Sequence, residues 1–356
     1  MERICETLML LRTKYRFNGY IHVKAIPGAP DELLSRAGYL ADRVSINLEL
    51  PTAQSLSKLA PNKSFKTILE PMEKITGTIA ANRLALGKDA RMERSSINRY
   101  LTGSIFNQNG THNGQAALSG TQRTALESGD KLSLPAVSKD MCVKRPFAPA
   151  GQSTQMIIGA TPETDLTLIR TTQHLYKNYD LKRVFYSAYI PLNEDSALPQ
   201  LDADVPLLRE HRLYQADWLL RFYGFQADEL LSESRPNFNE QLDPKCDWAI
   251  RHLGQFPVEV QNASYDMLLR IPGIGPKSAR RIVETRRYAK LDFDILKKIG
   301  VVLKRAHYFI TCNGRMMYRI PIEESYITEC LTDDNHKENW EITHQNEKYQ
   351  QLSLFE

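Results

Sequence analysis

The residues with the clearest chemical implication lie in a short turn, Ile271-Pro-Gly-Ile-Gly-Pro-Lys277. Gly273 and Gly275 reach backbone angles that bulkier residues avoid, so they predict a tight hairpin. A helix that begins near Pro276 then leaves the N–H groups of its first turn unpaired and pointing outward. Such a helix end attracts a phosphate through hydrogen bonds and through the helix dipole.

Basic side chains follow the turn and add attraction for a phosphate backbone that weakens with salt. None of them is placed to read a base edge, which predicts low sequence specificity. A plain turn with a Pro-Gly stop is the alternative, but it does not explain both glycines, the following lysine and the small Ala279 together. The predicted DNA-binding residues are Gly273, Gly275, Lys277, Ser278, Arg280 and Arg281.

Two helices and a second hairpin must position this turn. Ser264 is suited to cap a helix that runs to Arg270. A weaker hairpin follows in residues 291–306, with an Ile299-Gly300 turn and then a basic helix. This pairing resembles the tandem helix-hairpin-helix domains of bacterial DNA-binding and competence proteins, over residues 258–312.

The N-terminal part predicts an α/β fold. Four short segments indicate strands, and helical patterns separate them, as in parallel βα units. In the first, second and fourth of these segments apolar and polar residues alternate, so one face can pack under helices while the other is polar. A polar inner face suggests a barrel or half-barrel that holds a polar ligand; an ordinary sheet with one solvated face is the alternative. The predicted strands are 19–25, 43–50, 154–160 and 183–190, and the predicted helices are 1–16, 30–41, 52–60, 64–85, 163–178 and 207–223.

Several sequence blocks carry a second resemblance. MIIGATPETD looks like a strand and loop of radical SAM enzymes. The following blocks, in order with the IPGIG hairpin, resemble the DNA modification/repair radical SAM proteins: YRFNGYIHVKAIPGA, VSINLELPT, RPFAPAGQSTQMIIGATPETD, RVFYSAYIP and LLREHRLYQADWLLRFYGF. The resemblance implies a (β/α) barrel, S-adenosylmethionine and a [4Fe–4S] cluster as cofactors, and DNA as the substrate. It also implies that Asn47, Glu49, Gly159, Glu163 and Tyr189 line the S-adenosylmethionine side of the lumen.

The cysteines depart from this family pattern. Radical SAM enzymes hold their cluster with a CxxxCxxC loop, and the cluster needs thiolate ligands. The five cysteines here lie far apart, at Cys5, Cys142, Cys246, Cys312 and Cys330. We therefore expect a partial barrel of about four βα units, truncated at its N-terminus, that binds no cluster and no other metal. The odd number of cysteines and their wide spacing also argue against a disulfide framework.

The charge distribution separates the hairpin region from the C-terminal segment. Residues 265–310 contain eleven Lys/Arg and four Asp/Glu, whereas residues 322–356 contain two Lys/Arg and nine Asp/Glu. The acidic segment ends in Gln351-Leu-Ser-Leu-Phe-Glu, which resembles the peptide by which bacterial repair proteins bind the sliding clamp. Leu352, Leu354 and Phe355 would fill an apolar groove, and Gln351 would hydrogen-bond at its edge. A frayed terminus is the alternative.

The composition, with 42% hydrophobic and 25% charged residues, is typical of a globular protein. No signal peptide or membrane span is evident, so a cytoplasmic location is expected. The predicted organisation is a partial radical SAM-like barrel at 1–200 with a mobile insertion at 88–142, a helical linker at 201–257, the all-α hairpin domain at 258–312 and the acidic tail at 313–356.

Three hypotheses for function follow. The first is a radical SAM-family protein that acts on DNA and grips it with the hairpin domain. The second is a DNA-binding protein without catalysis, which the missing cysteine triplet favours. The third is a sugar-phosphate or other barrel enzyme, which the hairpin disfavours.

Overall fold

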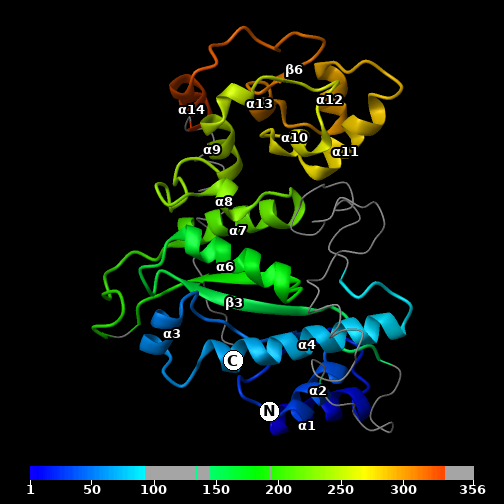
Figure 1. The fold of residues 1–356 in the computed structure, drawn as a ribbon, viewed down its shortest axis with the longest axis vertical. Coiled ribbons are helices and arrows are strands. Elements are labelled where there is room, and N and C mark those ends of the chain that lie inside the picture. The colour runs from blue at the N-terminus through cyan, green and yellow to red at the C-terminus, as the bar shows by residue number, and fades with distance from the viewer. Residues whose placement is uncertain (93–133, 135–144, 193, 333–356) are drawn as a thin grey trace. The chain divides into compact units, whose positions relative to one another are not determined.

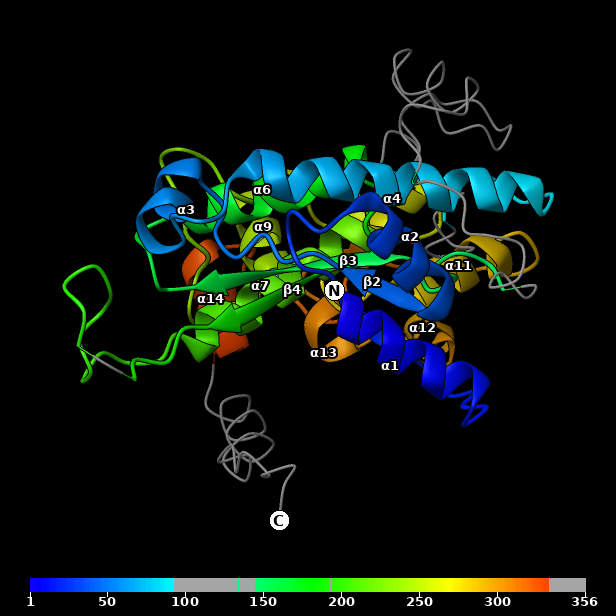
Figure 2. The same cartoon turned by 90° about the horizontal axis from the view of Figure 1, so that it is seen from below.

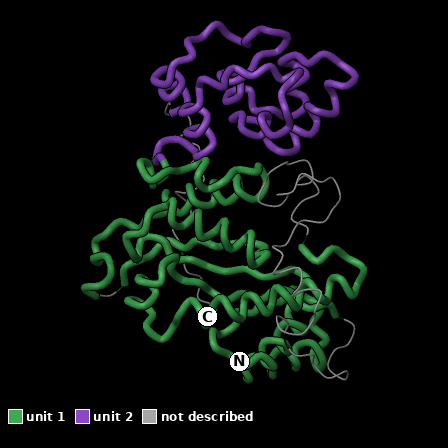
Figure 3. Tube along the Cα trace, viewed as in Figure 1, with its two compact units in different colours: residues 1–238 green, residues 239–356 purple. Residues whose placement is uncertain are grey.

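The computed structural model describes residues 1–92, 134, 145–192 and 194–332, and the insertion predicted at 88–142 lies almost wholly outside them. The chain divides into two compact units, Met1–Phe238 (unit 1) and Asn239–Glu356 (unit 2) (Figure 3).

Unit 1 is built from βα units, as the alternation of strand and helix predicts (Figure 1). Its four strands are all parallel and lie in the order β1-β2-β3-β4. Its described elements are α1 (Glu2–Thr13), β1 (His22–Lys24), α2 (Asp31–Leu40), β2 (Arg43–Ser45), α3 (Ala53–Leu59), α4 (Phe65–Ala85), β3 (Gln152–Ile158), α6 (Asp165–Asn178), β4 (Arg183–Ala188), α7 (Leu207–Phe222) and α8 (Ala227–Leu230).

The strand register confirms that the sheet has one apolar and one polar face. Residues that pair directly share a face, and Val44, Met156 and Tyr186 lie on the face that α4 and α6 cover (Figure 2). Gln152 donates to the Met72 carbonyl of α4 from this face, at 3.1 Å. The opposite face is mainly polar and carries these residues of β1 to β4: His22, Lys24, Arg43, Ser45, Ser153, Gln155, Ile157, Arg183, Phe185 and Ser187.

The first two strands are shorter than predicted, and the strand expected at 19–25 covers only His22–Lys24. The alternation in 43–50 predicts a strand over all eight residues, but β2 ends at Ser45. The Leu48 amide donates to the hydroxyl of Thr154 instead of to a backbone carbonyl, at 2.9 Å. Glu49, which has a left-handed conformation with φ 67°, then rejoins the sheet through an isolated bridge to Met156.

Side chains seal the outer edge of β4. The amide of Val184 donates to Tyr176 Oη at 3.0 Å, and the amide of Ala188 donates to Glu210 at 2.6 Å. Between them, Tyr214 Oη accepts from the Tyr186 amide and donates to the Tyr186 carbonyl. Helices α6 and α7 therefore satisfy the backbone groups that a fifth strand would otherwise pair.

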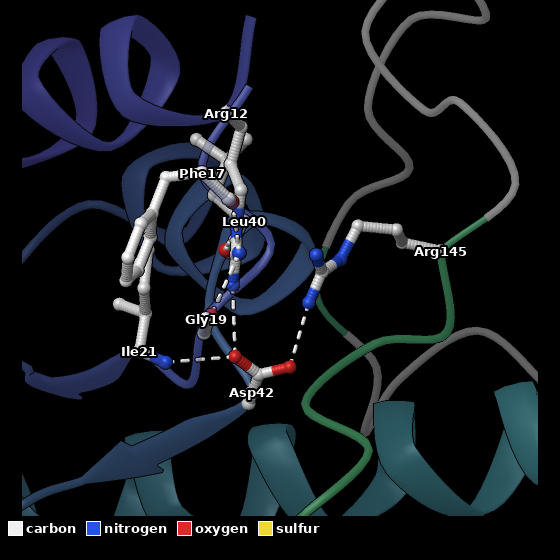
Figure 4. Close-up of polar contacts among 7 residues, drawn as sticks. All are labelled: Arg12, Phe17, Gly19, Ile21, Leu40, Asp42 and Arg145. Carbon is white, nitrogen blue, oxygen red and sulfur yellow. Dashed lines mark hydrogen bonds and ion pairs between the residues drawn. The ribbon is translucent and has the colours of Figure 1, made fainter. Parts of the chain in front are cut away.

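A carboxylate joins three segments at the start of the sheet (Figure 4). Asp42 accepts hydrogen bonds from Arg12 of α1 at 2.8 Å, from Arg145 at 2.6 Å and from the Ile21 amide at 2.8 Å. Arg12 also donates to the carbonyls of Leu40 and Gly19. Its side chain is only 7% exposed, so this ion pair is protected from solvent and fixes α1 against the turn before β2.

Unit 2 is mainly helical, as predicted for the hairpin region. Its described elements are α9 (Pro244–Arg251), a 3₁₀ turn (Leu253–Gln255), β5 (Val258–Glu259), α10 (Tyr265–Arg270), α11 (Pro276–Thr285), α12 (Phe293–Ile299), α13 (Leu303–Ala306), β6 (Ile310–Thr311) and α14 (Glu324–Thr332).

The expectation of an all-α hairpin domain is wrong in one detail. β5 and β6 pair in parallel and tie the beginning of the module to its end. Glu259 strengthens this closure, since its carboxylate accepts from the hydroxyl of Thr311 at 3.0 Å and from the amide of Gly314 at 2.8 Å. Strands of two residues are too short to show the alternation that would predict them.

Within the described part of the chain, no helix is both long enough and apolar enough to cross a membrane.

Candidate nucleic-acid interface

The first hairpin forms as the sequence predicts. Ser264 Oγ caps α10 by accepting from the Met267 amide at 3.1 Å. The chain then turns, and α11 begins at Pro276 with Gly275 as its N-cap residue. The first backbone bond of α11 runs from the Ala279 amide to the Gly275 carbonyl at 2.8 Å. The N–H groups that precede this bond stand at the free end of the helix.

The two glycines of the turn have different roles. Gly273 has φ 82°, and a Cβ there would lie 2.4 Å from the carbonyl oxygen of Val302. Gly275 has φ −96° and ψ 172°, which any residue adopts, so the predicted need for an unusual backbone angle at this position is wrong.

The second hairpin packs directly on the first. α12 ends at Gly300, which is left-handed with φ 98°, and α13 follows. The Val302 amide donates to the Gly273 carbonyl at 2.9 Å, so the two turns are hydrogen-bonded to each other. The close approach of Gly273 to Val302 is what leaves no space for a side chain at Gly273.

The predicted DNA-binding side chains divide into two groups. Ser278 Oγ donates to the Gly300 carbonyl at 2.8 Å, and Arg281 donates to the Ile299 carbonyl at 2.9 Å. These two side chains hold the second turn against α11. Arg280 pairs with Glu284 at 2.8 Å on the surface, and Lys277 is exposed on the first turn of α11. Of the four polar side chains, Lys277 therefore lies best for a phosphate bound at the helix end.

More basic residues surround the hairpins. Five further lysines and arginines of this region are exposed, and a large aromatic side chain, Tyr288, is 89% exposed among them. Exposed cations give the electrostatic surface that attracts a polyanion. They are Arg287, Lys290, Lys297, Lys298 and Lys304.

The structure adds a residue that the sequence did not single out. Lys245, on the first turn of α9, is only 8% exposed, and its Nζ donates to the Ile274 carbonyl between the two glycines, at 2.6 Å. Burial lowers the pKa of Lys245 to about 7; Asp243 and Cys246 oppose this shift, while Arg270 and Arg305 add to it. A lysine near a helix start is ordinarily solvated, so no local pattern predicts this contact.

The five residues assigned to a cofactor by resemblance come together in unit 1. Asn47 and Glu49 follow β2, Gly159 and Glu163 follow β3, and Tyr189 follows β4. All five thus lie at the carboxyl ends of neighbouring parallel strands, which is the edge where α/β sheets bind ligands.

Their local contacts differ. Asn47 is 5% exposed and donates to Gln155 at 3.3 Å. Glu49 forms an ion pair with Lys63 at 3.1 Å. Burial alone would raise the pKa of Glu163, but hydrogen bonds from hydroxyl groups, including that of Thr52 at 2.8 Å, lower it.

Helix α7 and the residue before it pack near Gly159 and Glu163, and Tyr189 bonds to the neighbouring strand. A Cβ on Gly159, which has φ 87°, would lie 2.6 Å from Pro206 Cγ, just before α7. Arg209 of α7 donates to the Glu163 carbonyl and pairs with Asp165 at 2.6 Å. The half-buried Tyr189 extends the β4 ladder through its amide, which donates to the Ile158 carbonyl at 2.8 Å.

The cysteine positions do not fit a [4Fe–4S] cluster. Among the described residues, no group of three or more His, Cys, Asp or Glu side chains is placed to hold a metal. Cys5 lies in α1, whereas Cys246, Cys312 and Cys330 belong to unit 2. The clamp-binding residues predicted at 351–355 lie outside the described residues.

Comparison with known proteins identifies one segment. Residues 258–285 match the sequence model of the helix-hairpin-helix motif, which covers β5, α10, the first hairpin and α11. No radical SAM family model matches the chain. No curated protein and no solved structure matches it. The matched segment points to DNA as a partner.

Proposed function

We propose that unit 2 binds double-stranded DNA through its phosphate backbone, without reading the base sequence. The observation that carries this proposal is the helix-hairpin-helix match at 258–285, together with the geometry of its first turn. The free end of α11 offers the N–H groups of Gly275, Lys277 and Ser278, and Pro276 between them has none. A phosphate oxygen bound there gains these hydrogen bonds and the favourable end of the helix dipole.

The side chains of the hairpin support a backbone contact more than a base contact. Lys277 carries a point charge on the first turn of α11, where it can reach the same phosphate. Ser278 is buried and bonded within the protein, and the exposed Arg281 uses one of its guanidinium donors for the Ile299 carbonyl, so neither side chain is fully available to read base edges. Specificity for sequence comes from base-edge contacts, so binding should depend on salt and vary little with sequence.

The test compares charge and hairpin variants on two duplexes of unrelated sequence. Lys277→Glu should weaken binding to both duplexes equally, by about tenfold or more near 0.1 M salt, and should reduce the salt dependence. The matched control is Lys58→Glu, the same change on an exposed lysine of unit 1. Gly273→Ala should weaken binding because its Cβ would meet Val302, whereas Gly254→Ala, where no atom lies within 4 Å, should not.

Two results would contradict the proposal. One is wild-type binding that does not weaken as salt increases. The other is a Lys277→Glu variant that loses affinity for one sequence alone.

A second candidate function concerns unit 1. We infer that the carboxyl edge of its sheet binds S-adenosylmethionine, as the resemblance to the DNA modification/repair radical SAM proteins implies. The supporting observation is that Asn47, Glu49, Gly159, Glu163 and Tyr189 gather at this edge. The buried amide of Asn47 and the half-buried Gln155 beside it are groups that could hydrogen-bond a ribose or an adenine.

Reductive cleavage of S-adenosylmethionine needs an iron–sulfur cluster; the sequence contains no CxxxCxxC loop, and the described residues include no group of His, Cys, Asp or Glu placed to hold a metal. A chain that binds DNA without catalysis agrees with this cysteine pattern.

A further inference from the structure

Lys245 lies where it can control the shape of the DNA-binding hairpin. It belongs to α9, which precedes the helix-hairpin-helix segment, and its Nζ reaches the carbonyl of Ile274 at 2.6 Å. Ile274 stands between the two glycines of the turn, and its own amide is used in a bond to the Ile271 carbonyl at 3.1 Å. The lysine side chain is buried, so it reaches the hairpin from the protein side and does not itself touch DNA.

The peptide group links this carbonyl to the phosphate site. The C=O of Ile274 and the N–H of Gly275 belong to one planar trans peptide, in which they point in opposite directions. A donor that holds the carbonyl therefore also fixes the direction of the Gly275 N–H. Gly275 is the N-cap residue of α11, and this N–H is the first donor at the helix end that faces the phosphate.

We propose that Lys245 is a positioning residue for DNA binding, whose ammonium group holds the Ile274 carbonyl and thereby orients the backbone N–H groups of the hairpin toward a phosphate. This inference rests on the function proposed for unit 2. A charged donor makes a hydrogen bond about twice as strong as a neutral one, so the protonated lysine holds the turn more firmly than the neutral amine.

The surroundings of Lys245 make this grip sensitive to pH. Four groups on three elements affect the amine: Asp243 and Cys246 at the start of α9, Arg270 on α10 and Arg305 on α13. Asp243 is itself engaged by Arg305 at 3.0 Å and caps α9 through the amides of Lys245 and Cys246. Burial outweighs the carboxylate and brings the pKa of Lys245 to about 7, so the ammonium form is lost between pH 6 and pH 8.5.

As pH rises and Lys245 loses its proton, the stability of the fold should increase and the affinity for DNA should decrease. The folded pKa of Lys245 lies below its unfolded value of 10.5, so the buried charge costs stability at pH 6 and this cost falls as pH rises above 7. DNA affinity should fall over the same range, because the hairpin loses its charged anchor. A residue that only stabilised the fold would not weaken binding while the protein became more stable.

The experiment measures duplex affinity at pH 6.0 and 8.5 for the full chain and three variants. From pH 6.0 to pH 8.5 both the wild type and Lys245→Met are compared for their loss of DNA affinity. The loss should be about fivefold greater in the wild type, and a fivefold change in affinity corresponds to about 1 kcal/mol. At pH 6.0, Lys245→Met should bind more weakly than wild type with an unchanged salt dependence, because the lysine meets no phosphate. Lys245→Arg keeps a permanent charge, so its affinity should change between the two pH values only as much as that of Lys245→Met.

Lys304→Met is the matched control, because Lys304 is an exposed lysine of the same unit. It should keep the wild-type pH profile. His252 and His307 are present in every protein compared, so their contribution cancels. Thermal melting at each pH identifies a variant that does not fold, and the test uses two substitutions at Lys245, so either folded variant can be compared with the wild type.

Wild-type binding that weakens with salt but has the same pH profile as Lys245→Met would overturn the role of Lys245 and leave DNA binding intact. A wild type that binds no duplex at either pH would instead overturn the function proposed for unit 2.

Discussion

Gly273 and Asn47 show how single residues constrain the two candidate sites. The left-handed backbone of Gly273 brings the first turn against Val302, so that the two hairpins form one surface. Asn47 is a buried amide at the carboxyl end of β2, and a buried polar side chain is costly unless it is hydrogen-bonded. Its bond to Gln155, at 3.3 Å, leaves further donor and acceptor capacity at the sheet edge.

The residue-scale prediction concerns this amide. Asn47→Leu keeps a side chain of similar size but removes the hydrogen-bonding groups, so it should weaken binding of S-adenosylmethionine by about tenfold or more, as loss of a hydrogen bond in a buried site does. Equilibrium dialysis of the full chain measures the affinity. Asn262→Leu, an exposed position in unit 2, should bind as wild type does. Wild-type protein that retains no S-adenosylmethionine at millimolar concentration would rule out the site.

At the scale of elements, α7 replaces a strand at the edge of the sheet. Tyr214 and Glu210 lie one turn apart on α7, and both hydrogen-bond to the backbone of β4. Burial raises the pKa of Glu210, while the Ala188 amide opposes this shift. The other end of the edge is held by Tyr176, whose hydroxyl also contacts the buried Asp217 of α7. Unit 1 therefore has one strand edge that its own helices protect.

Tyr214→Phe should destabilise unit 1, because it leaves the amide and the carbonyl of Tyr186 without this side-chain partner. The cost should be about 1–2 kcal/mol, toward the lower end of the range for lost hydrogen bonds since Tyr214 is only partly buried. The urea-denaturation midpoint of the full chain measures the effect. Tyr20→Phe, at a residue that is 58% exposed, is the control and should leave the midpoint in place. Equal midpoints for both variants would show that the edge does not depend on Tyr214.

At the scale of the whole molecule, opposite charges lie in neighbouring segments of unit 2. Residues 265–310 are basic and contain the hairpins, while residues 322–356 hold nine acidic against two basic residues. Because DNA repels the acidic segment, it is expected to serve another partner. The peptide Gln351-Leu-Ser-Leu-Phe355 resembles ligands of the bacterial sliding clamp, which encircles the DNA that the hairpins would bind. When the hairpins bind DNA, the C-terminal peptide is held near a clamp on the same DNA, which raises its effective concentration there.

We therefore predict that a peptide of residues 337–356 binds the purified sliding clamp with roughly micromolar affinity, as expected for a short linear segment. In the full chain, Leu354→Ala combined with Phe355→Ala should abolish clamp binding and leave DNA affinity unchanged, because these residues are remote in sequence from the hairpins. Ser353→Ala, between the two apolar residues, is the matched control and should bind. Calorimetry with no heat at high micromolar concentration would exclude this partner.

The sequence by itself determined the features that depend on neighbouring residues. Ser264 as a cap, Pro276 as the start of α11 and the alternation of polar and apolar residues in β1, β2 and β4 are all local, and the structure confirms them. The limits of β2 could not be predicted, since the break after Ser45 depends on the hydroxyl of Thr154 more than one hundred residues away.

Only the tertiary structure decided which polar side chains remain available to a ligand. Ser278 and one guanidinium donor of Arg281 bind carbonyls of the second turn, which lies about twenty residues along the chain. Lys245 reaches the first turn from α9, across 29 positions of sequence. In each case the side chain donates to a backbone carbonyl that packing of the elements brings close to it. Sequence spacing specifies helices, caps and strand faces, but it does not contain the distances between elements on which these contacts depend.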